Sequence, residues 1–346
     1  MVFAPTVAPR RREITKMSKK IIAVLVLLFI VAGLAFFIVS MGTKPTAGRK
    51  DKLKIVATLF PQYDFAKEIA GKHAEVTLLL PPGVESHTYE PTPADIVKIN
   101  AADMFIYTGK YMEQWAERII ASRSNKELEV IDVSSNIELS GMEDHDHDAD
   151  DGSHDHGDGG GEDHGEHGHG HLYDPHIWTD PNNALVMVDN ILAALNSADP
   201  AHAADYQKNA EALRKELRQL DADFKKVVAG GGRDEIIMGG RNAFHYFLKR
   251  YGLKAHAAHD SCSTEADPSA KKVASLIKEV KEEHIPIIFY EELSIPKVAS
   301  LVNRETGVKM LPLNSCHNIS REALESSATY IYLIKENLRN LREGLK

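Results

Sequence analysis

The amino-acid sequence predicts an α/β protein with two lobes of parallel sheet joined by helix. Short apolar strand patterns alternate with helix patterns in residues 53–133 and again after residue 234, which is the arrangement of parallel α/β proteins. Between these regions, residues 183–229 contain helix patterns and no strand pattern. A chain of 346 residues is long enough for two lobes.

Residues 1–50 are expected to direct the chain out of the cytoplasm. The basic stretch RREITKMSKK precedes 19 uncharged, apolar residues at 21–39, and such a helix can span a bilayer core of about 30 Å. This layout is typical of an export signal and predicts a cytoplasmic N-terminus. We favour an uncleaved signal anchor over a cleaved signal peptide, and Met17 is an alternative start to Met1. In each case the rest of the chain is extracytoplasmic.

The first lobe is expected over residues 51–182 and begins with a strand. Its strands are predicted at residues 53–59, 74–80, 103–109 and 128–133, and its helices at 62–70, from 94 and at 111–122.

A helical linking region follows at residues 183–230 and ends at a Gly-Gly-Gly run. The second lobe is expected over residues 231–346. Its strands are predicted at residues 235–240, 285–292 and 308–313, and its helices at 242–251, 268–283, 295–306 and from 320.

Residues 143–171 cannot join either lobe and are expected to be disordered. These 29 residues contain eight His, eleven Asp or Glu and eight Gly, with no aliphatic side chain larger than Ala. We interpret the stretch as an accessory that holds metal weakly at several exchanging sites. Its histidines are His145, His147, His154, His156, His164, His167, His169 and His171.

The charge of the chain is concentrated in this stretch. The formal net charge is −9, while the residues outside 143–171 carry 41 basic and 39 acidic side chains. A nearly neutral remainder gives no indication of a surface for nucleic acid, and we expect no nucleic-acid partner.

Two histidines in loops are candidates for the principal metal site. His87 lies between a strand and a helix start, and His176 lies between two Asp-Pro turns. Loops beyond the carboxyl ends of parallel strands are where such folds bind ligands. Imidazole is the commonest metal-binding group in proteins, although a single loop histidine is more often merely exposed.

The surroundings of these histidines resemble a known family. PPGVESHTYEPTPAD and DPHIWTDPNNA are similar to the two N-lobe ligand motifs of the substrate-binding proteins of zinc and manganese ABC transporters. The resemblance continues through AFHYFLKRYGL and IFYEELSIPKVASLVNRETGVKMLPL, and it covers residues from about 53 to the end. It implies two (β/α) lobes bridged by a long rigid helix, with a metal held between the lobes by two ligands from each. Zinc-specific members also carry a His-rich insertion before the second motif.

The second lobe departs from the family pattern. The third ligand position corresponds to Arg241, which cannot bind a metal, and the fourth corresponds to Asn314, a weak oxygen donor. His317 in the same loop as Asn314 is the replacement candidate. Glu291 is a weaker candidate for the metal ligand, and we expect it to form an ion pair with Arg241 instead. Glu292 could likewise bind the metal or pair with Arg241.

The resemblance implies that the chain is a monomeric carrier of Zn²⁺, with Mn²⁺ as the less favoured cargo. It would deliver the metal to an ABC permease powered by a cytoplasmic ATPase, and it would not be an enzyme. Alternatives are a membrane-anchored metal-scavenging or adhesive surface protein, a zinc-dependent hydrolase, and a site for an anion that Arg241 recognises. No phosphate loop or nucleophile motif supports an enzyme.

The two cysteines, Cys262 and Cys316, are expected to form a disulfide outside the membrane. Zinc ligation by the two thiolates is the alternative.

Overall fold

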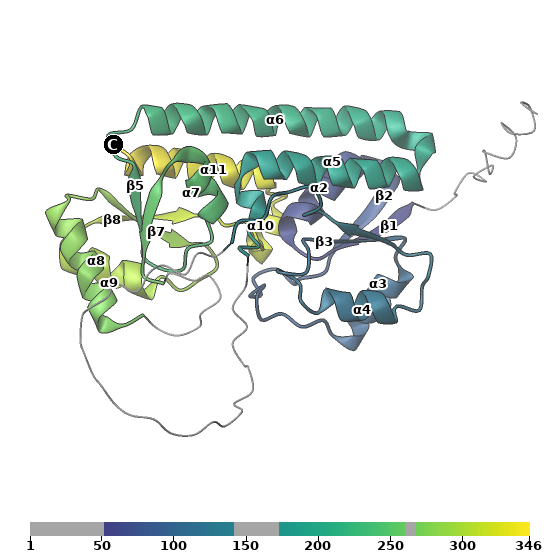
Figure 1. The fold of residues 1–346 in the computed structure, drawn as a ribbon, viewed down its shortest axis with the longest axis horizontal. Coiled ribbons are helices and arrows are strands. Elements are labelled where there is room, and N and C mark those ends of the chain that lie inside the picture. The colour runs from purple at the N-terminus through teal and green to yellow at the C-terminus, as the bar shows by residue number, and fades with distance from the viewer. Residues whose placement is uncertain (1–51, 142–172, 260–267) are drawn as a thin grey trace, which may run out of the picture. The chain divides into compact units, whose positions relative to one another are not determined.

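Two parallel four-stranded sheets form the framework of the computed structural model, which describes residues 52–141, 173–259 and 268–346. The first sheet has the strand order β2-β1-β3-β4, and the second has the equivalent order β6-β5-β7-β8 (Figure 1). Every strand pair is parallel. The predicted α/β class with two lobes is therefore confirmed.

The first sheet and its helices come from residues 53–132. In chain order they are β1 (Leu53–Ala57), α2 (Phe60–Ala70), η1 (Gly71–His73), β2 (Ala74–Leu78), α3 (Pro93–Ala101), β3 (Met104–Tyr107), α4 (Ala116–Ser122) and β4 (Glu129–Asp132). In the central strand β1 only Lys54 is exposed, because both faces of a parallel sheet are covered by helices.

The segment between the sheets is helical, as predicted. It contains η2 (Ile177–Thr179), α5 (Pro181–Ala198), η3 (Pro200–His202) and α6 (Ala203–Ala229). At the start of α5, the Asp180 side chain accepts a hydrogen bond from the backbone N–H of Asn182, and Pro181 occupies the first turn.

The second sheet repeats the plan of the first. Its elements are β5 (Glu235–Met238), α7 (His245–Tyr251), β6 (Lys254–Ala257), α8 (Ala270–Glu282), β7 (Ile287–Glu291), α9 (Lys297–Thr306), β8 (Lys309–Leu313), α10 (Arg321–Glu325) and α11 (Tyr330–Gly344).

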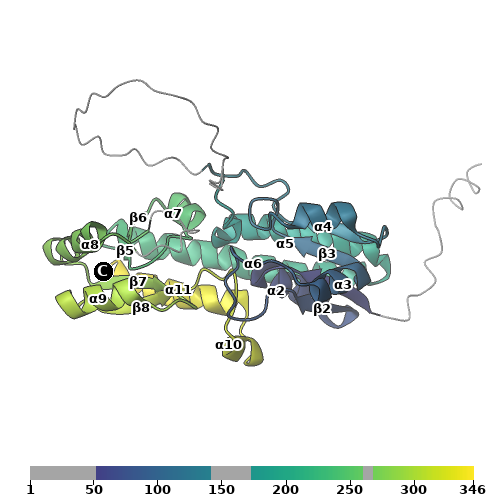
Figure 2. The same cartoon turned by 90° about the horizontal axis from the view of Figure 1, so that it is seen from below.

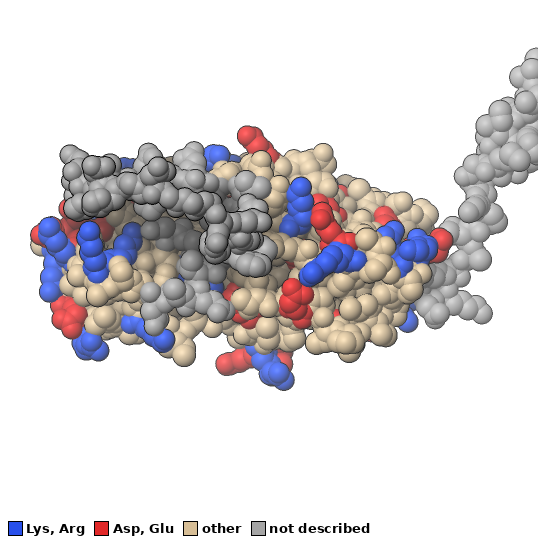
Figure 3. All heavy atoms as spheres, turned by 60° about the horizontal axis from the view of Figure 1, so that its bottom comes forward, with Lys and Arg blue, Asp and Glu red and all other residues tan. Residues whose placement is uncertain are grey.

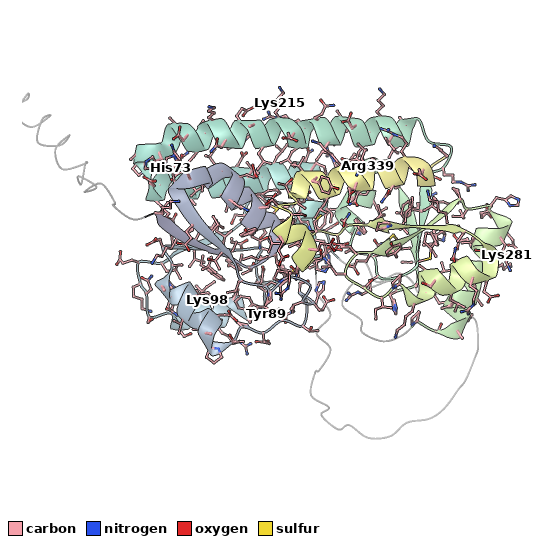
Figure 4. The ribbon with its side chains drawn as sticks, turned by 180° about the vertical axis from the view of Figure 1, so that it is seen from behind. His73, Tyr89, Lys98, Lys215, Lys281 and Arg339 are labelled. Carbon is pink, nitrogen blue, oxygen red and sulfur yellow. The ribbon has the colours of Figure 1, made fainter. Side chains whose placement is uncertain are left out.

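Helix α6 connects the two lobes. Its 27 residues extend for about 40 Å, and it contacts α2 and α5 on one side of the molecule and α7 and α11 on the other (Figures 1 and 2). Leu213, Leu217 and Phe224 face the core at helical spacing, while Lys215 is on the exposed face (Figure 4). One core cluster includes residues of both sheets together with α5, α6 and α11, so a single packed core joins the lobes.

Several predicted element boundaries need correction. Strand β6 was not predicted, and the helices predicted from residues 111 and 242 begin at Ala116 and His245. The single C-terminal helix predicted from residue 320 is two helices, α10 and α11. The predicted limits of the lobes at residues 182 and 230 stay predictions.

The N-terminal apolar segment at 21–39 and the His-rich stretch at 143–171 lie outside the described residues. Within the described ranges no helix is both long and apolar enough to cross a bilayer. On the face seen in Figure 3, the Lys and Arg side chains are interspersed with Asp and Glu.

Candidate metal centre

His87 and His176 meet at the carboxyl ends of the strands of the first lobe. His87 lies in the loop between β2 and α3, and His176 immediately precedes η2. Their Nε2 atoms are 3.2 Å apart. Two nitrogens bound to one tetrahedral zinc at 2.0–2.1 Å are separated by about 3.3 Å. The spacing of the two imidazoles therefore suits a shared zinc ion.

Asp174 orients the ring of His176. Its Oδ1 atom lies 2.9 Å from Nδ1 of His176 and accepts the backbone N–H of the same residue at 2.8 Å. Burial alone would raise the pKa of Asp174, but the His176 ring and N–H hold that pKa below its usual value. An ionised carboxylate only accepts hydrogen bonds, so Nδ1 carries the proton and Nε2 presents its lone pair.

His317 brings a third imidazole to the same place from the second lobe. It follows β8, and its ring centroid lies 5.9 Å from that of His87 and 6.0 Å from that of His176. The residue is only 5% exposed. Burial lowers the pKa of His317 below its usual value, which favours the neutral form that binds metals.

Arg241 joins the two lobes beside the histidines. It follows β5, and its Nη2 atom donates a hydrogen bond of 2.7 Å to Glu85 in the His87 loop. Its Nε atom lies 3.4 Å from Oε2 of Glu291, so the predicted pairing with Glu291 is present. Burial alone would raise the pKa of Glu85, but the hydrogen bond and charge of Arg241 hold it below its usual value.

Glu291 stands between this cation and His317. It ends β7 and is 4% exposed, and its Oε1 atom lies 3.7 Å from Nε2 of His317. One carboxylate oxygen thus faces Arg241 while the other faces the third imidazole.

Asn314 is hydrogen-bonded to Asn337. Its backbone N–H and its side-chain amide both donate to Oδ1 of Asn337 in α11, at 2.7 and 3.2 Å. In return, the Asn337 amide donates to the Asn314 carbonyl at 2.7 Å. The structure therefore gives this asparagine a role in attaching α11 to the end of β8.

The loops that carry the histidines are also linked to each other. Trp178, two residues after His176, is fully buried and donates its indole N–H to the Ser315 carbonyl at 2.7 Å. This bond fixes the His176 segment against the His317 segment. In the described ranges, no group of three or more His, Cys, Asp or Glu side chains is close enough together, as it stands, to hold a metal ion.

The predicted disulfide is wrong. Cys316 is a free thiol with no exposed surface, and it packs within the core cluster that joins the lobes. Its Sγ atom makes a weak contact of 3.8 Å with the carbonyl of Asn314. Burial raises its pKa well above the usual value, which also opposes zinc ligation by a thiolate. Cys262 lies outside the described residues.

Sequence reasoning missed Glu85, Asp174 and Ser315 as parts of this site. Asp174 had a local signal, because a carboxylate two residues before a histidine can reach its Nδ1 atom. Glu85 and Ser315 had no such signal, because their contacts depend on how the loops of the two lobes meet. The sequence predicts that Glu292 could bind the metal or pair with Arg241. In the structure it accepts hydrogen bonds from Ser315 instead. Its pKa is raised to about 7 by burial and by the charge of Glu291.

Comparisons with known proteins identify the family of the chain. The chain matches the family described as zinc-uptake complex component A, periplasmic, over residues 55–344. It is 34% identical over 324 residues to the high-affinity zinc uptake system protein ZnuA of Bacillus subtilis, covering 92% of this chain and 97% of that protein. It is 30% identical over 326 residues to the zinc-binding protein AdcA of Streptococcus pyogenes, covering 94% of this chain but 61% of AdcA.

A solved structure shows the same fold. The Zn(II)-bound ZnuA-like domain of Streptococcus pneumoniae AdcA has a TM-score of 0.69 and 29% identity, and the match covers 85% of this chain and 99% of that domain. The family description is that of a transport component, in agreement with the expectation that the chain is not an enzyme. Sequence, fold and the convergence of the histidines lead to one assignment: the chain belongs to the family of the periplasmic component A of zinc-uptake complexes.

Proposed function

We propose that this protein captures Zn²⁺ outside the cytoplasmic membrane and delivers it to an ABC-type permease driven by a cytoplasmic ATPase. The observation that carries the proposal is the 3.2 Å separation of the Nε2 atoms of His87 and His176, with the ring of His317 beside them. Imidazole nitrogens favour zinc, whereas manganese prefers oxygen ligands. The names of the relatives in Bacillus and Streptococcus support the same metal.

The proposed ligands are Nε2 of His87, His176 and His317 and Oε1 of Glu291. A zinc ion near the first two nitrogens attracts the Glu291 carboxylate, whose Oε2 atom remains beside Arg241. Small movements of the His317 and Glu291 side chains then complete a tetrahedral set of three nitrogens and one oxygen. Residues His87 and His176 belong to the first lobe and the other two to the second, so the metal fastens the lobes together.

This ligand set favours transport over catalysis. Catalytic zinc sites keep one coordination position open for water or substrate, whereas four protein donors leave none. A closed site holds the ion until the lobes separate at the permease. Mn²⁺ is the weaker cargo, because the proposed set offers it a single carboxylate oxygen.

We assign accessory roles to the segments outside the described residues. Residues 21–39 anchor the protein to the membrane or direct its export, and the His-rich stretch at 143–171 collects zinc near the principal site. The protein acts as a monomer, with the lobes at residues 51–182 and 231–346 and the linking helices between them.

Zinc uptake in cells tests the proposal directly. Cells that lack the gene are complemented with the wild-type chain or with His176→Ala, and the uptake of radioactive zinc is measured at limiting zinc. The wild type should restore uptake and the variant should not. His256→Ala is the matched control, because this histidine is 44% exposed and pairs with Glu279. Full uptake with His176→Ala would overturn the proposal.

A further inference from the structure

A chain of hydrogen bonds leads from His317 back to the carboxylate of Glu292. Nδ1 of His317 bonds to the hydroxyl oxygen of Ser315, and this oxygen lies 2.9 Å from Oε1 of Glu292. Glu292 also accepts the backbone N–H groups of Ser315 and Cys316, at 2.6 and 2.9 Å. The carboxylate therefore holds both the hydroxyl and the backbone of the segment that carries His317.

The direction of each bond follows from the groups involved. Both oxygens of Glu292 accept backbone N–H groups, Oε2 from Ser315 and Oε1 from Cys316, and the single hydrogen of the Ser315 hydroxyl is donated to Oε1. The Ser315 oxygen is then an acceptor for His317, and the proton of the neutral imidazole lies on Nδ1. Nε2 of His317 is left with its lone pair on the side of His87 and His176.

Glu291 acts in the opposite sense. Its Oε1 atom lies 3.7 Å from Nε2 of His317, and a carboxylate at that distance would attract a proton onto Nε2. In the absence of the Ser315 bond, the imidazole would therefore favour the tautomer that cannot bind zinc through Nε2.

We propose that Glu292 and Ser315 are positioning residues that hold His317 in the tautomer with a bare Nε2 atom before zinc arrives. This inference rests on the proposed function, because it concerns the third ligand of the same site. Asp174 does the same for His176 through a direct contact, so one proposed histidine ligand from each lobe is oriented by a carboxylate behind it.

Glu292 also stabilises the backbone of the same loop. Cys316, between the two partners, adopts a left-handed backbone with φ of 61°, which is costly for a residue with a side chain. The bond from its N–H to Glu292 stabilises that turn. Ser315→Ala is therefore the cleaner variant, because it removes the hydroxyl and leaves the backbone bonds to Glu292 in place.

The tautomer of His317 can be read without zinc. The metal-free full chain, solubilised in detergent and labelled with ¹⁵N at histidine, is studied at pH 8 by long-range ¹H–¹⁵N correlation, with His317 assigned from a His317→Gln sample. The wild type should show the proton on Nδ1. In Ser315→Ala the proton should move toward Nε2, and the zinc dissociation constant should rise roughly tenfold.

Matched variants separate orientation from general damage. Ser315→Thr keeps the hydroxyl and should restore the Nδ1 tautomer. Ser294→Ala removes a hydroxyl that donates to the Glu291 carbonyl and should leave His317 unchanged. Glu292→Gln should shift the proton toward Nε2, because an amide N–H can donate to Ser315 and reverse the chain of bonds.

A wild-type His317 with its proton on Nε2, or an unchanged tautomer in Ser315→Ala, overturns the proposal. Because this measurement needs no metal, failure of zinc transport would leave its result intact.

Discussion

Arg241 in the second lobe donates a hydrogen bond of 2.7 Å to Glu85 in the first lobe. The two residues are 156 positions apart in the chain, and Glu85 also accepts the backbone N–H of His87 at 3.2 Å. The position at which the family resemblance implies a metal ligand is thus occupied by a cation that holds the loop of His87, a proposed ligand. We propose that His317 and Glu291 supply the ligands of the second lobe instead.

Replacing Arg241 with Gln should destabilise the metal-free protein by roughly 1–3 kcal/mol, because two carboxylates that are 31% and 5% exposed lose their cation. Urea unfolding measures this change. Arg218→Gln is the control, since Arg218 and its partner Glu211 are both 56% exposed, and its effect should be much smaller. Equal effects of the two substitutions would show that the Arg241 pairs stabilise the protein no more than an exposed ion pair does.

Loss of any one imidazole should remove high-affinity zinc binding. We expect His87→Ala, His176→Ala and His317→Ala to raise the dissociation constant by at least about a hundredfold, because each variant leaves a tetrahedral ion without a nitrogen donor. Competition with a chelator of known affinity provides the measurement, and His256→Ala should bind like the wild type. Retained affinity in His317→Ala would place the ligand of the second lobe elsewhere.

Deletion of residues 143–171 should leave one tight zinc site and remove the weak ones. The stretch is rich in Gly and is expected to bind zinc at exchanging sites, whereas the three histidines of the lobes are held by packing. Calorimetric titration with zinc distinguishes the two classes by affinity and stoichiometry. If the deletion abolished the tight site, the principal site would lie within the deleted stretch.

The pH dependence of the free energy of unfolding should reflect the ionisation of Glu113, which is 2% exposed. Burial raises its pKa from 4.5 to about 7, although it accepts hydrogen bonds from Thr58 and from the N–H groups of Thr108 and Gly109. The folded chain therefore binds this proton more strongly than the unfolded chain. Protonated Glu113 thus contributes to the free energy of unfolding, fully below about pH 4.5, and this contribution is lost as the pH rises through 7.

Glu113→Gln lacks this ionisation. From pH 5 to pH 8, the unfolding free energy of the wild type should fall by roughly 2–3 kcal/mol more than that of the variant. Urea unfolding of both proteins at the two pH values gives the difference. A parallel pH dependence of the two proteins would mean that Glu113 titrates with the same pKa in the folded and unfolded chains.

Much of the fold could be predicted because its signals are local. The strands that form the sheet centres are apolar runs, and helix starts such as Asp180-Pro181 carry their own caps. Strand β6 escaped prediction because its four residues, KAHA, lie at the sheet edge and only Ala257 is buried. The two helices predicted too early include residues 111–115, which contain turns, and residues 242–244, which have no regular secondary structure.

Only those parts of the site that lie in local sequence motifs could be predicted from the sequence. The patterns around His87 and His176 singled out two histidines whose Nε2 atoms lie 3.2 Å apart in the structure. The choice between Asn314 and His317 depends on the path of the chain after β8, where the bonds to Asn337 turn Asn314 toward α11. The interlobe bond from Arg241 to Glu85 depends on tertiary packing, which no local pattern contains.

A crystal structure of the zinc-loaded protein, with anomalous diffraction measured on both sides of the zinc absorption edge, would show which residues bind the ion. We predict one strong peak where the lobes meet, within about 2.0–2.2 Å of Nε2 of His87, His176 and His317 and of Oε1 of Glu291. A strong zinc peak bound only by residues 143–171, with none at these three histidines, would contradict the account.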